Sequence, residues 1–383
     1  MGKRVLIVTN TASMIKLFNI RNIKILQKLG HEVIVATNFS NPGTISEQVN
    51  QELIKKLRDL NVKLYNIEFS RSVGNPISNR RAFKELCKIV DDNSINVIHT
   101  HAPLSSIISR RVAHAKKIKC IYTSHGFQFF HGGPLKNWLL FYPVERFYAK
   151  YTDALITINK DDYKIAQTFP SKHVYYIPGV GTNITQMKKY YKSSRNIVRK
   201  RIRKELGVTP NDFLILSVGE LSKRKNHLTV LKAIARLNNP SIKYIVAGIG
   251  PEDEKLKEES KKLGLEKQFK LLGFKKNVRD LYLAADLNAF ISLREGLGMG
   301  GLEGCALGLY IVTSKNTGAK DYVTNTEMGI KVSNPLNVSE VAEAIKKVMH
   351  KHIVVKPDYK SLLKFDVANV DKLMEKIYRK EIG

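Results

Sequence analysis

Two glutamates that frame a glycine-rich stretch, Glu295 and Glu303, are the residues of this chain best placed to do chemistry. The stretch, residues 292–308, reads S-L-R-E-G-L-G-M-G-G-L-E-G-C-A-L-G, and the apolar run that leads into it is typical of a buried strand. From Met299 onward the pattern is helical. A strand, a glycine turn and a helix N-terminus hold a phosphate well, because free backbone N–H groups and the helix dipole point at the anion.

The two glutamates indicate what lies beside that phosphate. Carboxylates repel a phosphate, so Glu295 and Glu303 are better suited to accept hydrogen bonds from hydroxyl groups. Phosphate-binding amides between two hydroxyl-binding carboxylates indicate a nucleotide-sugar. The alternative interpretation is a glycine-rich helix that packs closely on a sheet.

The charge of the chain is the unusual feature of its composition. Among 383 residues, Lys and Arg number 64 against 34 acidic residues, a net charge of +30. Such an excess favours an anionic partner: nucleic acid, an anionic membrane surface or a phosphorylated substrate. No helix-turn-helix, zinc-finger or RNA-binding signature is present, so we expect a membrane surface and no nucleic acid. A lysine-rich proteome would account for part of the excess.

The cysteines and the apolar runs bear on the compartment. The three cysteines lack C-x-x-C spacing, so we expect neither a disulfide framework nor a zinc site, and a reducing cytosol fits. The first apolar run is too short for a signal peptide, and no run of about 18 apolar residues could span a membrane. We therefore expect a cytoplasmic protein, peripheral on the inner face of the cell membrane.

Strand and helix patterns alternate along the whole chain, which predicts an α/β fold with parallel sheets. A P-G-V-G turn at 178–181 separates two such series and is the predicted hinge. We predict two doubly wound Rossmann-like domains, 1–178 together with a tail helix at 366–383, and 179–365. Ligands bind such sheets at the carboxyl ends of the strands, so a cleft between facing domains is the expected site.

Candidate binding residues follow the predicted strands. They are Ser13, His101, His125, Glu220, Arg224, Lys225, Gly248, Gly250 and Phe274. The cluster K-R-K at 223–225 is informative, because a diphosphate leaving group gains negative charge that Lys and Arg stabilise in a metal-free site. A solvated basic loop is the alternative.

The histidines are candidates both as sugar ligands and as metal ligands. His125, beside a glycine, could orient or polarise a sugar hydroxyl, although a structural histidine is the alternative. His99 and His101 flank one residue of a predicted strand, and we expect them to face opposite sides of it. No metal site is therefore expected, and the D-x-D motif of metal-dependent sugar transferases is absent.

The motifs in order resemble those of GT-B glycosyltransferases of family 4, over nearly the whole chain. The spacing Glu295-x7-Glu303 carries the resemblance, together with G-E-L-S-K-R-K-N-H at 219–227, G-I-G-P-E and L-G-F. The first half is similar to the acceptor domain of the bacterial exopolysaccharide and capsule subgroup, through Y-T-S-H-G-F-Q-F-F and I-T-I-N-K-D-D-Y. The resemblance implies a GT-B fold whose C-terminal helix crosses back to the N-terminal domain.

The resemblance also implies an activity. It is the retaining transfer of a hexose or N-acetylhexosamine-type sugar from a nucleoside-diphosphate sugar, UDP by family habit, without a metal or cofactor. A polyprenyl-diphosphate-linked saccharide would be the acceptor. Glu295 would hold the donor sugar's hydroxyls, Lys225 the diphosphate, and His125 would lie by the transferred sugar. The other implied substrate-binding residues are Gly296, Leu297, Gly298, Met299, Gly300, Glu303 (ribose), Phe274 (base), Arg224, Glu220, Gly248, Gly250, Ser13 and His101.

The chain departs from the family pattern at several places. Glu220 stands where many relatives have Arg, and Thr11-Ala12-Ser13 replaces paired glycines. The extra glycines at 298, 300 and 301 are expected to leave room for a bulky donor substituent or to lower activity. Two alternatives follow: a UDP-sugar 2-epimerase of the same architecture, and a non-catalytic donor-binding homologue acting as a partner subunit.

The stretch 127–151 alternates aromatic with basic residues, which suits a segment lying in a membrane interface. An ordinary buried helix is the alternative. A polyprenyl-linked acceptor lies in an anionic bilayer, so we expect the first domain to dock there.

Overall fold

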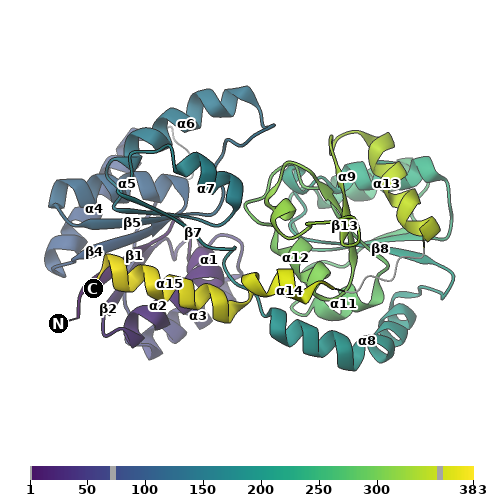
Figure 1. The fold of residues 1–383 in the computed structure, drawn as a ribbon, viewed down its shortest axis with the longest axis horizontal. Coiled ribbons are helices and arrows are strands. Elements are labelled where there is room, and N and C mark those ends of the chain that lie inside the picture. The colour runs from purple at the N-terminus through teal and green to yellow at the C-terminus, as the bar shows by residue number, and fades with distance from the viewer. Residues whose placement is uncertain (1, 70–74, 352–356) are drawn as a thin grey trace. The chain divides into compact units, whose positions relative to one another are not determined.

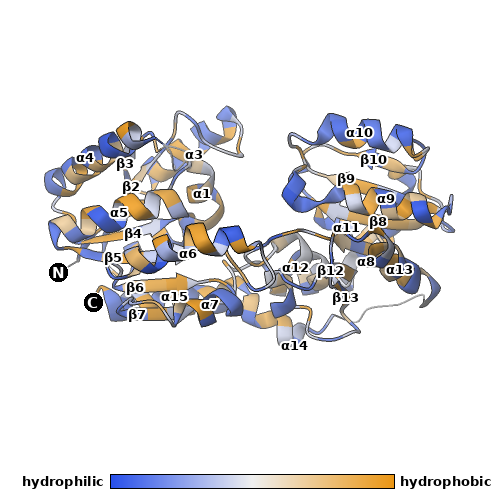
Figure 2. Ribbon diagram, turned by 90° about the horizontal axis from the view of Figure 1, so that it is seen from above, coloured by the Kyte–Doolittle hydropathy of each residue, from blue (hydrophilic) through white to orange (hydrophobic). Residues whose placement is uncertain are grey.

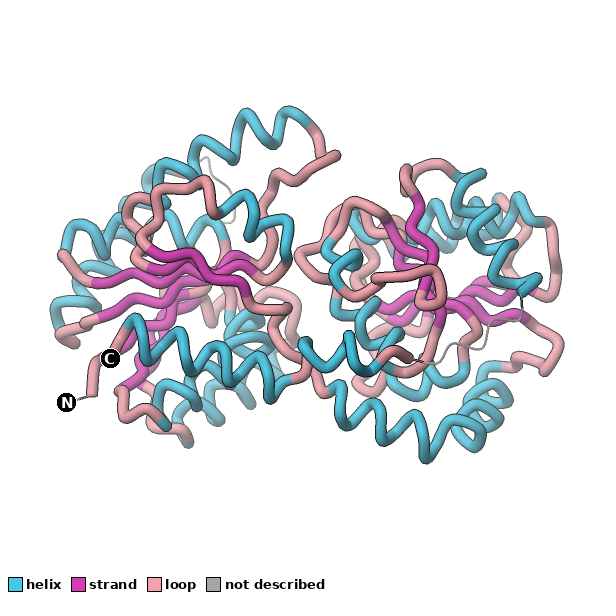
Figure 3. The backbone as a smooth tube through the Cα atoms, viewed as in Figure 1, coloured by secondary structure: helices cyan, strands magenta, loops and turns pink. Residues whose placement is uncertain are grey.

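The computed structural model describes residues 2–69, 75–351 and 357–383, which form two compact units (Figure 1). The first unit comprises residues 1–181 and 368–383, and the second comprises residues 182–367. Each unit has a parallel sheet covered by helices, as Figure 3 shows with strands in magenta and helices in cyan. The predicted α/β architecture of two Rossmann-like domains is confirmed.

In the first unit the described strands form a seven-stranded sheet in the order β3-β2-β1-β4-β5-β6-β7. They are β1 (Arg4–Val8), β2 (Glu32–Thr37), β3 (Lys63–Asn66), β4 (Val97–His101), β5 (Lys119–Ser124), β6 (Ala154–Thr157) and β7 (His173–Tyr176). Helices cover both faces, so β1, β2 and β6 are apolar over most of their length, as Figure 2 shows for β6. The strand order reverses between β1 and β4, which makes the edge beyond these two strands the expected ligand site.

The helices of the first unit come from both ends of the chain. They are α1 (Ala12–Met14), a π-helical turn (Ile15–Asn19), α2 (Ile20–Lys28), α3 (Glu47–Asp59), α4 (Pro76–Asp92), α5 (Pro103–Lys116), α6 (Leu135–Ala149), α7 (Lys160–Ala166) and α15 (Val367–Glu381). Helix α15 is tied to the first unit by an ion pair of 3.0 Å between Arg21 and Asp371. The C-terminal helix therefore completes the N-terminal unit.

In the second unit the described strands form a six-stranded sheet in the order β10-β9-β8-β11-β12-β13. They are β8 (Phe213–Val218), β9 (Ile242–Ala247), β10 (Phe269–Leu271), β11 (Leu287–Phe290), β12 (Tyr310–Ser314) and β13 (Gly329–Val332). The helices are α8 (Ile184–Leu206), α9 (His227–Leu237), α10 (Asp253–Lys262), α11 (Arg279–Ala284), α12 (Met299–Ala306), α13 (Val338–Lys351) and α14 (Tyr359–Leu362). Here the strand order reverses between β8 and β11.

The predicted interface segment, 127–151, divides into two parts. Phe127 and Phe129 belong to the apolar core and stack on each other at 5.0 Å. Helix α6 follows, and its outer face exposes Leu139 and Phe147. The alternative of an ordinary buried segment therefore holds for the first part, whereas much of the helix is exposed, and its docking on a membrane stays a prediction.

A buried ion pair attaches α6 to the rest of the first unit. Arg110 on α5 is 1% exposed, and its guanidinium lies 3.0 Å from the Glu145 carboxylate of α6. The Tyr122 hydroxyl donates to the same carboxylate at 3.2 Å, and the Arg110 guanidinium lies 4.5 Å from the Tyr122 ring centre. Both charges are removed from water, so removing either side chain would leave the other charge buried without a partner.

Replacing Arg110 by alanine is expected to destabilise the first unit by about 3–5 kcal/mol, because the Glu145 carboxylate is left buried without its cation. Urea unfolding followed by the fluorescence of Trp138 measures this, since Trp138 is the only tryptophan and packs against Phe129 at 5.2 Å.

The double variant Arg110→Met/Glu145→Leu should recover most of the loss, because it removes both charges together. The control is Arg81→Ala, which breaks an exposed pair with Glu85 and should leave the transition unchanged. An Arg110→Ala protein as stable as wild type would contradict the assignment.

Candidate functional site

The carboxyl ends of β8 and β11 bring together the basic cluster and the first glutamate of the glycine stretch. One carboxylate oxygen of Glu295, Oε1, lies 2.6 Å from Lys225 Nζ and 2.7 Å from an Arg224 guanidinium nitrogen. The Glu295 side chain is only 10% exposed. Burial alone would raise the pKa of its carboxyl, but the charges of Lys225 and Arg224 outweigh that effect, and the pKa lies below its ordinary value.

Local backbone structure holds the two cations there. Asn226 adopts the left-handed conformation with φ of 58° and ends the K-R-K turn. Its side-chain amide donates to the carbonyls of Ile291 at 3.2 Å and Pro335 at 2.7 Å. The Leu293 N–H donates to the Arg224 carbonyl at 2.8 Å, so the loops after β8 and β11 are joined directly. Sequence reasoning missed Asn226, although an asparagine directly before a helix is a turn signal.

Glu220 lies at the edge of this cluster. Its carboxylate is 3.6 Å from the Arg224 guanidinium, and its side chain is 45% exposed. Arg224 therefore stands between two carboxylates, whereas Lys225 contacts Glu295 and lies 4.8 Å from the Phe290 ring centre.

The glycines of α12 fit against the sheet. A Cβ at Gly298 would lie 2.6 Å from the Phe290 ring, and one at Gly300 would lie 2.8 Å from the Val218 carbonyl oxygen. A Cβ at Gly301 would overlap the Tyr322 hydroxyl. The expectation that these glycines leave room for a donor substituent is wrong, because the protein's own core fills that space.

Polar side chains from distant elements fix the start of α12. The Tyr282 hydroxyl donates to the Gly300 carbonyl at 2.7 Å, and the Tyr322 hydroxyl donates to that of Gly298 at 3.0 Å. Among the described residues, no acceptor of the chain receives a hydrogen bond from the N–H groups of 296–300. Those amides, which include Leu297 and Met299, are the donors that a phosphate requires. The two tyrosines were missed, since nothing in the local sequence links them to the glycines.

Among the described residues, Glu303 has no ion pair like those that Glu295 makes with Arg224 and Lys225. Burial raises the pKa of the Glu303 carboxyl to about 7, and the charge of Arg279 offsets only part of that rise. With a pKa of about 7, the Glu303 carboxyl is partly protonated at neutral pH. Its protonated form can donate a hydrogen bond as well as accept one.

The remaining candidates of the second unit follow β9 and β10. Gly248 and Gly250 lie so close to the Gly219 and Leu221 carbonyls that a Cβ at either position would clash. Phe274 is 73% exposed, so its ring is free to contact a ligand.

In the first unit, the candidates lie beyond β1, β4 and β5. Ser13 is buried, and its hydroxyl pairs with that of Thr11 at 3.0 Å. His101 Nδ1 lies 3.0 Å from His125 Nε2.

The expectation that His99 and His101 face opposite sides of the strand is wrong. Their ring centres are 4.3 Å apart, because alternate residues of a strand share one face. Among the described residues, no group of three or more His, Cys, Asp or Glu side chains could hold a metal ion.

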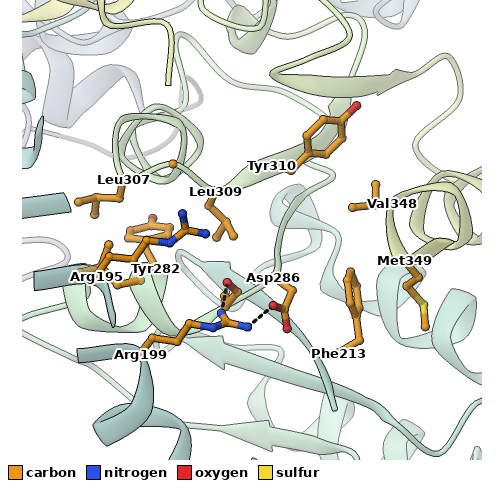
Figure 4. Close-up of a pocket in the computed structure, with 13 residues that line it drawn as sticks. Arg195, Arg199, Phe213, Tyr282, Asp286, Leu307, Leu309, Tyr310, Val348 and Met349 are labelled. Atoms are coloured by element: carbon orange, nitrogen blue, oxygen red, sulfur yellow. Dashed lines mark hydrogen bonds and ion pairs between the residues drawn. The ribbon is translucent and has the colours of Figure 1, made fainter. Parts of the chain in front are cut away.

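A cavity of about 260 Å³ lies at the other edge of the second unit's sheet, where β8, β11 and β12 begin (Figure 4). Arg199 is paired there with Asp286, and Phe213, Tyr310 and Met349 line the apolar side. Because parallel sheets bind ligands at the carboxyl ends of their strands, the glycine-rich site is the better candidate.

Comparison with known proteins agrees with this geometry. Residues 22–180 match the family described as Glycosyltransferase Family 4, and residues 198–360 match Glycosyl transferases group 1. The chain is 30% identical to a Bacillus subtilis protein named "Putative glycosyltransferase EpsD", over 99% of this chain and 97% of that one. It is 27% identical to an Escherichia coli enzyme named UDP-Gal:alpha-D-GlcNAc-diphosphoundecaprenol alpha-1,3-galactosyltransferase, over 65% of each.

Solved structures show the same fold. A glycosyltransferase from Rickettsia africae superposes with a TM-score of 0.75 at 17% identity, covering 100% of this chain and 99% of that one. Anabaena HepE in complex with UDP and glucose superposes with a TM-score of 0.75 at 16% identity, covering 99% and 100%. The two Rossmann-like units and these neighbours define the GT-B class. The chain belongs to the glycosyltransferase family that joins a family 4 domain to a group 1 domain.

The Glu303→Gln variant is expected to be more stable than wild type above pH 7, by about 1–3 kcal/mol, and equally stable near pH 4.5. Because the folded-state pKa of Glu303 is raised to about 7, the wild type binds an extra proton below that pH and loses stability as pH rises through it. Thermal unfolding at a series of pH values measures the difference in stability between the variant and the wild type. Glu327→Gln, at an exposed site, is the control. A stability difference between Glu303→Gln and wild type that does not grow with pH would refute the burial argument.

Proposed function

We propose that the chain is a retaining, metal-independent hexosyltransferase. Its donor is a nucleoside-diphosphate sugar, with UDP as the nucleotide and a hexose or N-acetylhexosamine as the sugar. Its acceptor is a polyprenyl-diphosphate-linked saccharide in exopolysaccharide or capsule assembly. The observation that carries this proposal is the contact of Glu295 with Lys225 and Arg224 beside the amides of residues 296–300.

The groups at that contact match the parts of a nucleotide-sugar. A diphosphate requires cations and N–H donors, which Lys225, Arg224 and the start of α12 provide. Sugar hydroxyls require acceptors, which Glu295 provides. Glu303, four residues along the helix from Met299, is assigned to the ribose hydroxyls, and exposed Phe274 to the base.

The names of relatives support the choice of donor and acceptor. The Escherichia coli relative is named for UDP-Gal and a diphosphoundecaprenol acceptor, and HepE was solved with UDP and glucose. A Campylobacter jejuni relative, 34% identical over 32% of this chain and 33% of that one, is named for a diphospho-undecaprenol saccharide. Metal independence rests on the paired cations at the phosphate-binding loop.

The first unit supports docking on an anionic membrane surface. Helix α6 exposes Leu135, Leu139 and Leu140 at 72%, 70% and 62%, and Phe147 at 51%. Lys150 lies over the Phe147 ring at 3.8 Å, so apolar and basic groups share one face. No helix in the described part of the chain is long and apolar enough to cross a bilayer. We therefore assign the protein to the cytoplasmic side of the membrane as a peripheral protein.

Glu295→Gln and Lys225→Ala should each lower kcat for sugar transfer by roughly 10²–10³, the scale for one lost transition-state stabiliser. The assay measures UDP released from UDP-sugars in the presence of a lipid-linked acceptor. Lys223→Ala is the matched control, since Lys223 is exposed on the same turn.

Near-native activity of both variants would refute the assigned site. Loss of activity in EDTA that Mg²⁺ or Mn²⁺ restores would contradict the metal-free mechanism. An isomerised donor without transfer would favour the 2-epimerase, and donor binding without turnover would favour a non-catalytic partner subunit.

The Leu139→Glu/Phe147→Glu variant is expected to float with phosphatidylglycerol vesicles several-fold less than wild type at physiological salt, because it places charge on the docking face. Co-flotation and circular dichroism check binding and folding together. Leu336→Glu is the control, because Leu336 is also exposed, at 60%, but lies in the second unit. Equal flotation of all three proteins would exclude α6 as the docking face.

A further inference from the structure

Three histidines stand in a row at the carboxyl ends of β4 and β5 in the first unit. The ring centres of His99 and His101 are 4.3 Å apart, and those of His101 and His125 are 5.3 Å apart. The outer ring, that of His125, also packs at 4.7 Å on Phe18. The row therefore runs from the buried interior to the half-buried His125.

The innermost histidine is held on both sides. His99 Nδ1 pairs with the Tyr378 hydroxyl of α15, and its Nε2 pairs with the Thr123 hydroxyl, both at 2.9 Å. Both of its nitrogens are thus occupied, and neither is left to bond the next ring. The His99 ring is therefore held in place, and the His101 ring packs against it.

The middle histidine has one bonded nitrogen and one unbonded nitrogen. His101 is 1% exposed, its Nδ1 lies 3.0 Å from His125 Nε2, and its Nε2 is buried without a partner. Burial lowers the pKa of His101 well below its ordinary value and that of His125 to about 4, so both rings are neutral at physiological pH.

The direction of the bond between two neutral rings follows from the unbonded nitrogen. If His101 accepted from His125, the His101 proton would sit on Nε2 as a buried N–H without an acceptor. If His101 donates from Nδ1, Nε2 carries only a lone pair. Orphaned buried N–H groups are rarer in proteins than unsatisfied acceptors, so the second arrangement is favoured.

We propose that His101 is a positioning residue that donates to His125 Nε2 and thereby fixes His125 in the tautomer protonated on Nδ1. Among the described residues, His125 forms its hydrogen bond through Nε2 and none through Nδ1, so the N–H at Nδ1 is available to a ligand. Its Nε2 lone pair is already engaged. His125 then donates a hydrogen bond to a sugar oxygen and does not act as a general base.

This inference rests on the proposed function for the ligand, but the tautomer can be tested without one. Long-range ¹H–¹⁵N correlation spectra of the full chain with ¹⁵N-labelled histidine distinguish protonated from unprotonated ring nitrogens. The His125 signals are those lost in His125→Asn. We expect a protonated Nδ1 and an unprotonated Nε2 for His125, and the reverse would overturn the proposal.

A matched pair of variants tests the consequence for catalysis. In His101→Asn the side-chain NH₂ takes the place of Nδ1 as a donor, whereas the carboxylate of His101→Asp, of nearly equal size, can only accept. The Asn variant should keep the His125 tautomer and lose less kcat than the Asp variant. The Asp variant should move the proton to Nε2 and lower kcat about tenfold to a hundredfold.

The controls separate folding and function. Thermal unfolding of both variants, with the surface variant His114→Asn beside them, shows whether either loses its fold. Equal tautomers and equal kcat in the Asn and Asp variants would overturn the proposal. If the wild type transferred no sugar, the proposed function would fail. The spectra would still show which ring donates in the His101–His125 hydrogen bond, so the two failures can be told apart.

Discussion

A carboxylate removed from water needs cations beside it, and the second unit is organised around that requirement. Glu295 is almost enclosed, and Lys225 and Arg224 contact the same oxygen atom. A ligand that draws these cations toward a diphosphate must offer Glu295 hydrogen-bond donors, or the carboxylate would be left buried and unpaired. A nucleotide-sugar does both, because its hydroxyls lie beside its phosphates. Under the proposed function, one side chain would therefore couple the recognition of the two parts.

The second constraint is the close approach of α12 to its sheet. The glycines allow Phe290 and Tyr322 to contact the helix backbone, and hydroxyl groups of Tyr282 and Tyr322 hold its first carbonyls. The backbone amides are thereby fixed before any ligand binds, which is what electrostatic preorganisation requires. The glycines act through rigidity, and donor selectivity must come from other residues.

The sequence predicted the alternating elements, because buried strands and amphipathic helices leave local patterns. It also selected Glu295 and Lys225 as candidates, since charge and glycine spacing are local patterns too, and the structure brings the two side chains within 2.6 Å. Their role in the site stays a prediction. The sequence could not predict the packing role of the α12 glycines, because Tyr322 lies more than twenty residues away along the chain. The expectation that His99 and His101 face opposite sides is wrong for a simpler reason: residues two apart on a strand share a face.

The position of α15 in the first unit has a consequence for synthesis. Tyr378 supplies the hydroxyl that holds His99, yet all of residues 182–367 leave the ribosome before it does. The first unit thus begins to form early and acquires its last helix late. A nascent chain cannot form the Tyr378–His99 hydrogen bond until the second unit has been translated, so the order of translation delays the completion of the first unit.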